Sequence, residues 1–169
     1  MFDARHFVGF GNNSNVKNLL LRKISVDDEL FLQELFFDVR SLEFLQFGFP
    51  SEQLKPLLAM QYNAQTQSYK AQYPNAEHSI IELNGEKIGR LLVNREAGNT
   101  LLVDIAILHN FRGQGFGSFL LEKLKSESDC VNLSVYKTNF GAIKLYEKLG
   151  FAVTNNDEMY LEMEWKNAG

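Results

Sequence analysis

Cysteine, proline and long hydrophobic runs are scarce in this sequence. Its 169 residues include one cysteine, Cys130, and three prolines, so no disulfide can form within the chain. No apolar run approaches the roughly 20 residues that a membrane-spanning helix needs. A basic surplus is also missing, because 17 Lys and Arg residues are outnumbered by 21 Asp and Glu residues. These absences argue against a disulfide scaffold, a membrane protein and a partner that is nucleic acid.

The N-terminal segment shows none of the basic, apolar and small-residue regions of a signal peptide. Residues 11–18, "GNNSNVKN", are rich in turn formers and predict a loop. A single cysteine is typical of a reducing compartment. We therefore expect a soluble cytoplasmic protein with an N-terminal extension over residues 1–18 and one domain over residues 19–169.

The hydrophobic period changes several times along that domain. After a strand over 19–24, Ser25 can cap a helix that reaches about Arg40. We expect that helix to turn Leu30, Leu35 and either Phe36 or Phe37 inward. The aromatic segment 41–50 predicts a loop or broken helix, and residues 51–72 a second helix that Pro56 would kink or restart near its N-terminus.

The second half of the domain alternates strands and helices. Asn84-Gly85 lies between two apolar runs and is a strong signal for a hairpin. The further elements that we expect are strands over 78–83, 87–93, 100–108, 130–135, 151–155 and 160–165, and helices over 115–128 and 140–149. The order β-α-α-β-β-β-α-β-α-β-β predicts an α/β fold with helices on both faces of a mixed sheet.

Three glycines at alternate positions follow an arginine in "HNFRGQGFG" (109–117). A P-loop would need Lys and Ser or Thr after the last glycine, which this chain lacks. A dinucleotide site would need a Gly-x-Gly-x-x-Gly spacing after a first strand. A strand, an arginine and a glycine turn at a helix N-terminus are enough for an anion site, because unpaired amides point at the anion. The alternative is a tight turn without a ligand.

The stretch "DIAILHNFRGQGFGSFLLEKL" resembles the signature of the GNAT superfamily of acyl-CoA-dependent N-acyltransferases, through Arg112, Gly115 and Gly117. A second family motif is matched by "NFGAIKLYEKLGF", and the resemblance spans roughly residues 19–165. Residues 57–76 are similar to a subgroup of mostly uncharacterised bacterial GNAT proteins. The residues that carry the second motif are Asn139, Ala142, Leu145, Tyr146, Gly150 and Phe151.

This resemblance implies a mostly antiparallel sheet of about seven strands, splayed at its centre and flanked by about four α-helices. It also implies acetyl-CoA as cofactor. The diphosphate would lie against the turn, and the pantetheine arm would lie beside the preceding strand. The cofactor-binding residues implied are Ile105, Ala106, Ile107, Arg112, Gly113, Gln114, Gly115, Phe116, Gly117, Ser118, Asn139, Ala142 and Tyr146.

Two residues are candidates for proton transfer. The family role carried onto Tyr146 is that of general acid to the CoA sulfur, and the alternative is a core tyrosine. Asp104 lies on an apolar strand, where a lone carboxylate needs a reason. It could take a proton from the amine through water, or pair with a cation. Glu82 and His78 are the next candidates for the base.

The acceptor pocket is expected near the first two helices. Phe44, Phe47 and Phe49 would give it apolar walls, and Gln61, Gln65 and Tyr69 form a polar stripe with a four-residue period. The alternatives are that the phenylalanines belong to the core and that the stripe faces water. Such a pocket would suit amines of the amino-acid, arylamine or small-peptide type.

The expected function is transfer of an acetyl group from acetyl-CoA to a primary amine of a small molecule by direct attack. The alternatives are a protein or peptide N-acetyltransferase and a non-catalytic acyl-CoA-binding domain. No metal-ligand spacing is found, and no metal, nucleic-acid or membrane partner is expected. The sequence leaves open the acceptor, the acyl chain, the base and whether a homodimer forms.

Overall fold

The computed structural model describes residues 5–7 and 16–169. The strands are β1 (Arg5–Phe7), β2 (Leu19–Lys23), β3 (Glu77–Leu83), β4 (Glu86–Glu96), β5 (Asn99–Ile107), β6 (Cys130–Tyr136), β7 (Ala152–Asn156) and β8 (Tyr160–Lys166). The α-helices are α1 (Glu29–Leu45), α2 (Ser51–Gln72), α3 (Phe116–Ser126) and α4 (Phe140–Lys148), with short 3₁₀ turns η2 (Val26–Asp28) and η3 (His109–Phe111). The predicted class and element order are confirmed for the part after residue 18.

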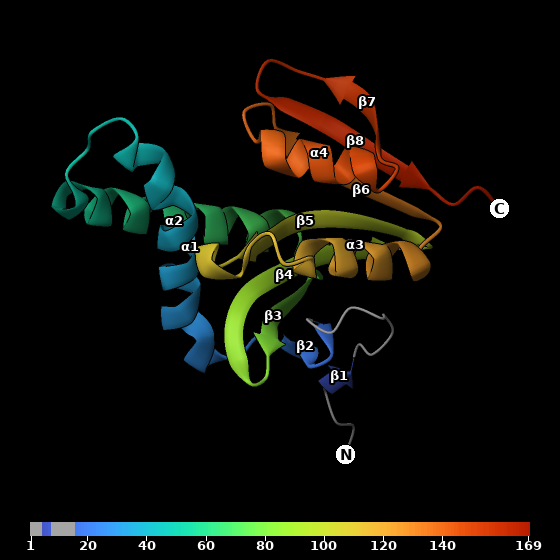
Figure 1. Ribbon diagram of the computed structural model, residues 1–169, viewed down its shortest axis with the longest axis horizontal. Coiled ribbons are helices and arrows are strands. Elements are labelled where there is room, and N and C mark those ends of the chain that lie inside the picture. Colours follow the sequence, from blue (N-terminus) through green and yellow to red (C-terminus); the bar gives the residue numbers. More distant parts are fainter. Residues whose placement is uncertain (1–4, 8–15) are drawn as a thin grey trace.

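All strands form one sheet in the order β1-β2-β3-β4-β5-β6-β8-β7 (Figure 1). The eighth strand, β1, lies in the segment that was expected to be an extension, and it pairs with β2 through Arg5 and Arg22. Val16 is also buried, with 3% of its surface exposed. The sheet therefore includes a strand from before residue 18. The predicted loop over 11–18 falls largely outside the described residues.

The sheet is antiparallel except between β5 and β6, and there the two strands separate. Their parallel pairing runs only from Asn99 and Cys130 to Leu102 and Leu133. Beyond these pairs β5 continues along β4, and β6 continues along β8. The predicted splay at the centre of the sheet is confirmed.

A β-bulge lies on β5 where the separation begins. Leu92 pairs with Asp104 and Val93 pairs with Leu102, so Val103 is the extra residue. Val93 and Leu102 pack in the core under α3 and α4. Because successive residues of a strand point to opposite faces, Leu92 and Asp104 point to the other face. Without the extra residue, Leu102 and Asp104 would share one face.

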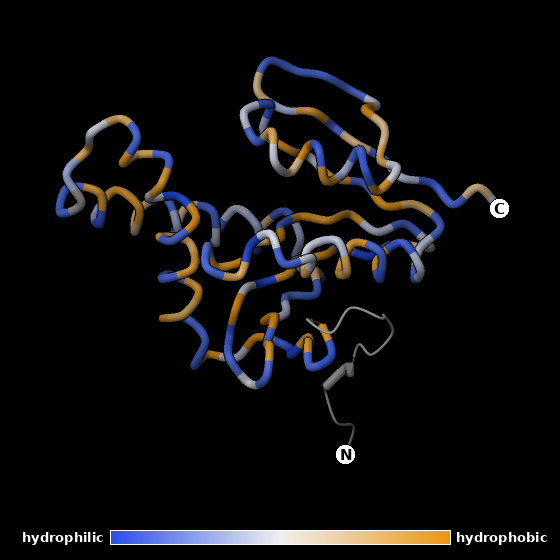
Figure 2. The backbone as a smooth tube through the Cα atoms, viewed as in Figure 1, coloured by the Kyte–Doolittle hydropathy of each residue, from blue (hydrophilic) through white to orange (hydrophobic). Residues whose placement is uncertain are grey.

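Two hydrophobic cores cover the two faces of the sheet. The larger one packs α3 and α4 against β4, β5 and β6, and the smaller one lies between α1, α2 and Ile80 of β3. The central strand β5 is mainly hydrophobic along its length (Figure 2). Among the helices that the structure describes, none has the length and the apolar character needed to cross a bilayer.

Helix α1 differs from the prediction in two ways. The residues Leu32, Leu35 and Phe36 face the core, whereas Leu30 is 68% exposed. A 3₁₀ turn precedes the helix. The helix also continues to Leu45, so only residues 46–50 form a loop, and α2 runs unbroken through Pro56.

The predicted hairpin at Asn84-Gly85 is confirmed. At the β3–β4 turn, Asn84 and Gly85 have φ angles of 53° and 83°. Two successive residues in the left-handed region form the turn type that the Asn-Gly pair predicts.

A buried carboxylate joins the start of α1 to the sheet. Asp28 is 1% exposed and accepts from Arg22 Nη2 at 2.8 Å and Lys87 Nζ at 2.7 Å. It also accepts from the backbone amide of Ser25 at 2.8 Å. The hydrogen bond from Arg22, helped by those from Lys87 and Ser25, holds the pKa of Asp28 well below its usual range.

Candidate active site

The glycine turn joins β5 to α3. Gly113 and Gly115 have φ angles of 72° and 89°, in the left-handed region that disfavours side chains. Gly115 is the residue immediately before α3. The turn is anchored at its start by Arg112, whose Nε donates to the carbonyl of Ile107 at 2.9 Å.

The backbone amides of this turn are free to bind an anion. Among the described residues, no protein group accepts a hydrogen bond from the amides of residues 113–118; the first bond of α3 comes from Phe119 to the carbonyl of Gly115. Free amides at a helix N-terminus, with the helix dipole behind them, stabilise negative charge. The side chain of Phe116 is buried in the core, so this residue can contribute only its backbone.

A pocket of about 680 Å³ opens where β5 and β6 separate. Its lining comes from α1, α2, both separated strands, α4 and β8. Because α1 and α2 cover one face of the sheet and α4 the other, the pocket passes through the splay and joins the two faces. Figure 1 shows α1 and α2 as an arm beside this part of the sheet.

Tyr146 reaches this pocket from α4. Its ring packs against Phe151 with centroids 5.8 Å apart, and 7% of the residue is exposed. Burial, with a smaller effect from the charge of Asp104, raises the pKa of Tyr146 to about 12. The hydroxyl therefore keeps its proton at neutral pH and can donate it in the pocket.

Asp104 lies in the pocket as one half of an ion pair. Its Oδ2 accepts from Arg90 Nε at 2.6 Å, and Arg90 Nη2 donates to Gln65 Oε1 of α2 at 2.7 Å. The Arg90 guanidinium also lies 6.0 Å from the ring centre of Tyr69. One buried arginine thus ties α2 to β5.

The register of the sheet explains this arrangement. His78, Leu92 and Asp104 form one row across β3, β4 and β5, and Ile80, Arg90 and Ala106 form the next. The rows share the face that packs on α2, so Arg90 is the diagonal neighbour of Asp104.

The two other candidates for the base lie outside the pocket lining. Glu82 pairs with Arg22 Nε at 2.8 Å. His78 has a buried Nε2 with no partner among the described residues. Burial, and the charge of Arg90, lower the pKa of His78 to about 4.

Asn139 and Ala142 lie at the start of α4. The side chain Oδ1 of Asn139 accepts from the amide of Ala142 at 3.2 Å, which is the helix cap that the sequence allows. Asn139 also lines the pocket, together with Ile105 and Ala106.

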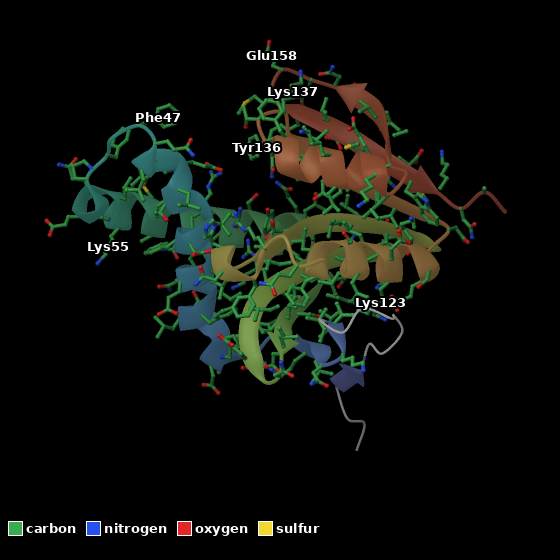
Figure 3. The ribbon with its side chains drawn as sticks, in the orientation of Figure 1. Phe47, Lys55, Lys123, Tyr136, Lys137 and Glu158 are labelled. Carbon is green, nitrogen blue, oxygen red and sulfur yellow. The ribbon has the colours of Figure 1, made fainter. Side chains whose placement is uncertain are left out.

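The predicted acceptor residues divide into two groups. Gln61, Gln65 and Tyr69 all line the pocket from α2. Phe44, Phe47 and Phe49 do not: Phe44 packs on the smaller core and against Phe49, and Phe47 and Phe49 are 79% and 47% exposed. The reason is that α1 runs five residues further than expected and carries these rings to its outer end, where Figure 3 shows Phe47 pointing away from the body of the protein.

Several pocket residues were missed at the level of sequence. Arg90 had a signal, since a charged residue inside the apolar run "KIGRLLV" needs a buried partner. Arg40 and Glu43 of α1 and Tyr160 of β8 had none. No group of three or more His, Cys, Asp or Glu side chains that could hold a metal occurs in the described part of the chain.

A family model described as "Acetyltransferase (GNAT) family" matches residues 36–151. No curated protein sequence matches the chain.

Solved structures with the same fold include PaiA N-acetyltransferase from Thermoplasma acidophilum in complex with coenzyme A. It is 19% identical, with a TM-score of 0.67, over 88% of this chain and 99% of that one. An acetyltransferase from Thermus thermophilus is 19% identical, with a TM-score of 0.66, over 90% and 99%. RimL, a ribosomal L7/L12 α-N-protein acetyltransferase in complex with coenzyme A, is 12% identical, with a TM-score of 0.58, over 91% and 97%.

Proposed function

Because this chain belongs to the GNAT acetyltransferase family, whose model covers more than half of it, we propose that it acetylates the primary amine of a small molecule by direct attack, with acetyl-CoA as donor. One observation carries this proposal. A single pocket brings Tyr146, Asp104 and the α2 stripe together at the splay of the sheet.

The residues of the glycine turn fit the cofactor. The free amides of residues 113–118 suit its diphosphate, and the unpaired edge of β5 beyond Leu102 suits its amide-containing arm. Bound acetyl-CoA supplies an acetyl group activated as a thioester. The relatives crystallised with coenzyme A support this assignment.

Two side chains of the pocket supply the proton transfers. The amine must be neutral to attack, and it loses a proton when the new C–N bond forms. Asp104 is assigned as the acceptor of that proton, since only its Oδ2 bonds to Arg90 and no described residue donates to its Oδ1. Tyr146 is assigned as the donor to the sulfur that leaves when the C–S bond breaks, because its hydroxyl remains protonated up to a pKa of about 12.

The size and lining of the pocket favour a small acceptor over a protein. Its volume of about 680 Å³ lies in the range of small-molecule sites, roughly 300–1,000 Å³. A peptide N-terminus is the second candidate, which the fold shared with RimL supports. A non-catalytic acyl-CoA-binding role would leave the placement of Tyr146 and Asp104 unexplained.

A panel of amines incubated with acetyl-CoA, with release of free thiol as the readout, tests the proposal. Tyr146→Phe should lower kcat by about 10- to 1,000-fold, the range for a positioned proton donor, and leave CoA affinity unchanged. Tyr62→Phe is the matched control, since this buried tyrosine of α2 does not line the pocket. Equal turnover by Tyr146→Phe and the parent protein would remove Tyr146 from the mechanism.

A further inference from the structure

Two polar atoms in the pocket lack a hydrogen-bond partner. In the described part of the chain, buried side-chain atoms without a partner are Arg40 Nε, Gln61 Oε1 and His78 Nε2. Arg40 and Gln61 line the pocket, and His78 does not. Buried polar atoms are almost always hydrogen-bonded. An unmet N–H donor and an unmet carbonyl acceptor in one pocket therefore point to the groups that a ligand would bring.

Arg40 is held in place by the packing of α1. Phe36, Arg40 and Glu43 lie at intervals of four and three residues, so they share the helix face that lines the pocket. Asp38 of the same helix accepts from the amide of His109 at 2.7 Å, which fixes α1 against the end of β5. The Arg40 guanidinium lies 5.9 Å from the ring centre of Phe36. The Arg40 side chain is therefore positioned by its contact with Phe36 and by the packing of α1 on the sheet.

The charges of the pocket leave Arg40 available for an anion. The charged lining residues are Arg40, Glu43, Arg90 and Asp104. Arg90 and Asp104 neutralise each other at 2.6 Å. Arg40 contacts Glu43 only through Nη1 at 3.3 Å, and Glu43 is 60% exposed, so this pair is weak. With two carboxylates, each facing an arginine, the described lining does not suit a polycation.

The rest of the pocket is lined mainly by apolar residues, several of them aromatic. Tyr136 and Tyr160 pack with ring centres 4.3 Å apart on the side of β6 and β8, and Tyr69 lies on the side of α2. Aromatic walls with a few polar groups bind the apolar part of a small ligand and orient the rest.

We infer that the acceptor is a free amino acid with an apolar or aromatic side chain, whose carboxylate is bound by Arg40 and whose amine is oriented by Gln61 Oε1 in the pocket that Asp104 also lines. This inference depends on the proposed acetyltransferase function and adds the class of substrate. On this inference, Arg40 determines specificity because it binds the carboxylate of the acceptor.

Matched pairs of acids and amides test the inference. Initial rates with acetyl-CoA are compared for L-phenylalanine and L-phenylalaninamide, and for L-leucine and L-leucinamide. A charged hydrogen bond is worth about 10- to 150-fold, so each acid should exceed its amide by at least about 10-fold in kcat/KM. Arg40→Gln should remove this preference by raising KM for the acids while the amides are unchanged. Glu43→Gln, which frees Arg40 of its competing carboxylate, should preserve or increase the preference.

Equilibrium binding gives a second readout. Each acid should raise the melting temperature of the parent protein more than its amide does, and Arg40→Gln should abolish this difference without changing the shift caused by CoA. Amides that match or exceed the acids would overturn the carboxylate assignment and leave the acetyltransferase function intact. Equal losses for acids and amides in Arg40→Gln, or loss of CoA binding, would also overturn it. Absence of turnover with every amine would instead overturn the proposed function.

Discussion

Arg90 Nε lies 2.6 Å from Asp104 Oδ2, so a buried cation and a partly exposed carboxylate share the floor of the pocket. Arg90 is tied to α2 through Gln65 as well. The pair therefore connects the helix arm to the strand that borders the splay. Its strength decides how firmly α2 is held against β5.

Removing either member of this pair should cost stability. Arg90→Met leaves Asp104 without its cation, and Asp104→Asn leaves the buried Arg90 without its carboxylate. Each should lower the free energy of unfolding by about 1–3 kcal/mol, less than for a fully buried pair because Asp104 is partly exposed. In urea denaturation the double variant should be more stable than the sum of the single losses predicts, by about 1 kcal/mol or more. Strictly additive losses would show that the two residues do not interact.

The glycine turn should be needed for cofactor binding. CoA at 100 times its Kd should stabilise the parent protein by about 2.7 kcal/mol and raise its melting temperature. Gly115→Val should abolish this shift, because a branched side chain at a φ of 89° distorts the free amides. Gly85→Val is the control, since it places the same strain in the remote β3–β4 turn. It should lower stability and keep the response to CoA.

The buried carboxylate at the start of α1 should make stability depend on acid pH. Asp28 has a depressed pKa in the folded state, so its contribution is complete above the unfolded pKa of about 3.9 and is lost as the pH falls below that value. Asp28→Asn should cost about 2–4 kcal/mol at pH 7. The difference from the parent protein should shrink between pH 4 and pH 2.5 in urea denaturation. Asp27→Asn, at the exposed neighbouring position, should change stability by less than about 0.5 kcal/mol.

The imidazole of His78 should make the free energy of unfolding depend on pH in a higher pH range than Asp28 does. Its pKa is lowered to about 4 in the folded state, against about 6.5 when unfolded. Between these values only the unfolded chain takes up the proton, so stability falls as the pH drops, by up to about 1.4 kcal/mol per pH unit. His78→Phe removes both the titration and the unpartnered Nε2. It should flatten the profile between pH 6.5 and pH 4, and a slope equal to that of the parent protein would contradict this reading.

The fold was largely predictable because the sequence patterns that mark its strands, helices and turns lie within short segments. The period of the apolar residues marks strands and helices, and Asn84-Gly85 fixes the hairpin without help from the rest of the chain. The residues proposed to bind the cofactor, such as Gly115 and Asn139, also belong to short motifs. The inward stripe of α1 was less predictable: Leu30 and Leu32 are both apolar, but only Leu32 is buried.

The part of the pocket proposed to bind the acceptor depends on contacts that no short segment contains. Gln65 and Arg90 are 25 residues apart in sequence and meet at 2.7 Å. Phe47 and Phe49 have the composition of a pocket wall, but the extra turn of α1 carries them away from the pocket. Arg40 lies on α1, which a hydrogen bond from the His109 amide to Asp38 joins to the end of β5. Such long-range positions follow from packing.

The extra residue on β5 reverses which alternate side chains of the strand face the larger core. Up to Leu102 the alternation of side chains is in phase with the core under α3 and α4. After Val103 the phase is reversed, and Asp104 lies on the face of Arg90 and α2. Deleting Val103 would restore one phase along the whole strand, so that Asp104 and Leu102 would compete for the same face. A substitution at Val103 keeps the count and hence the phase. At this position the chain therefore depends on the presence of a residue more than on its type.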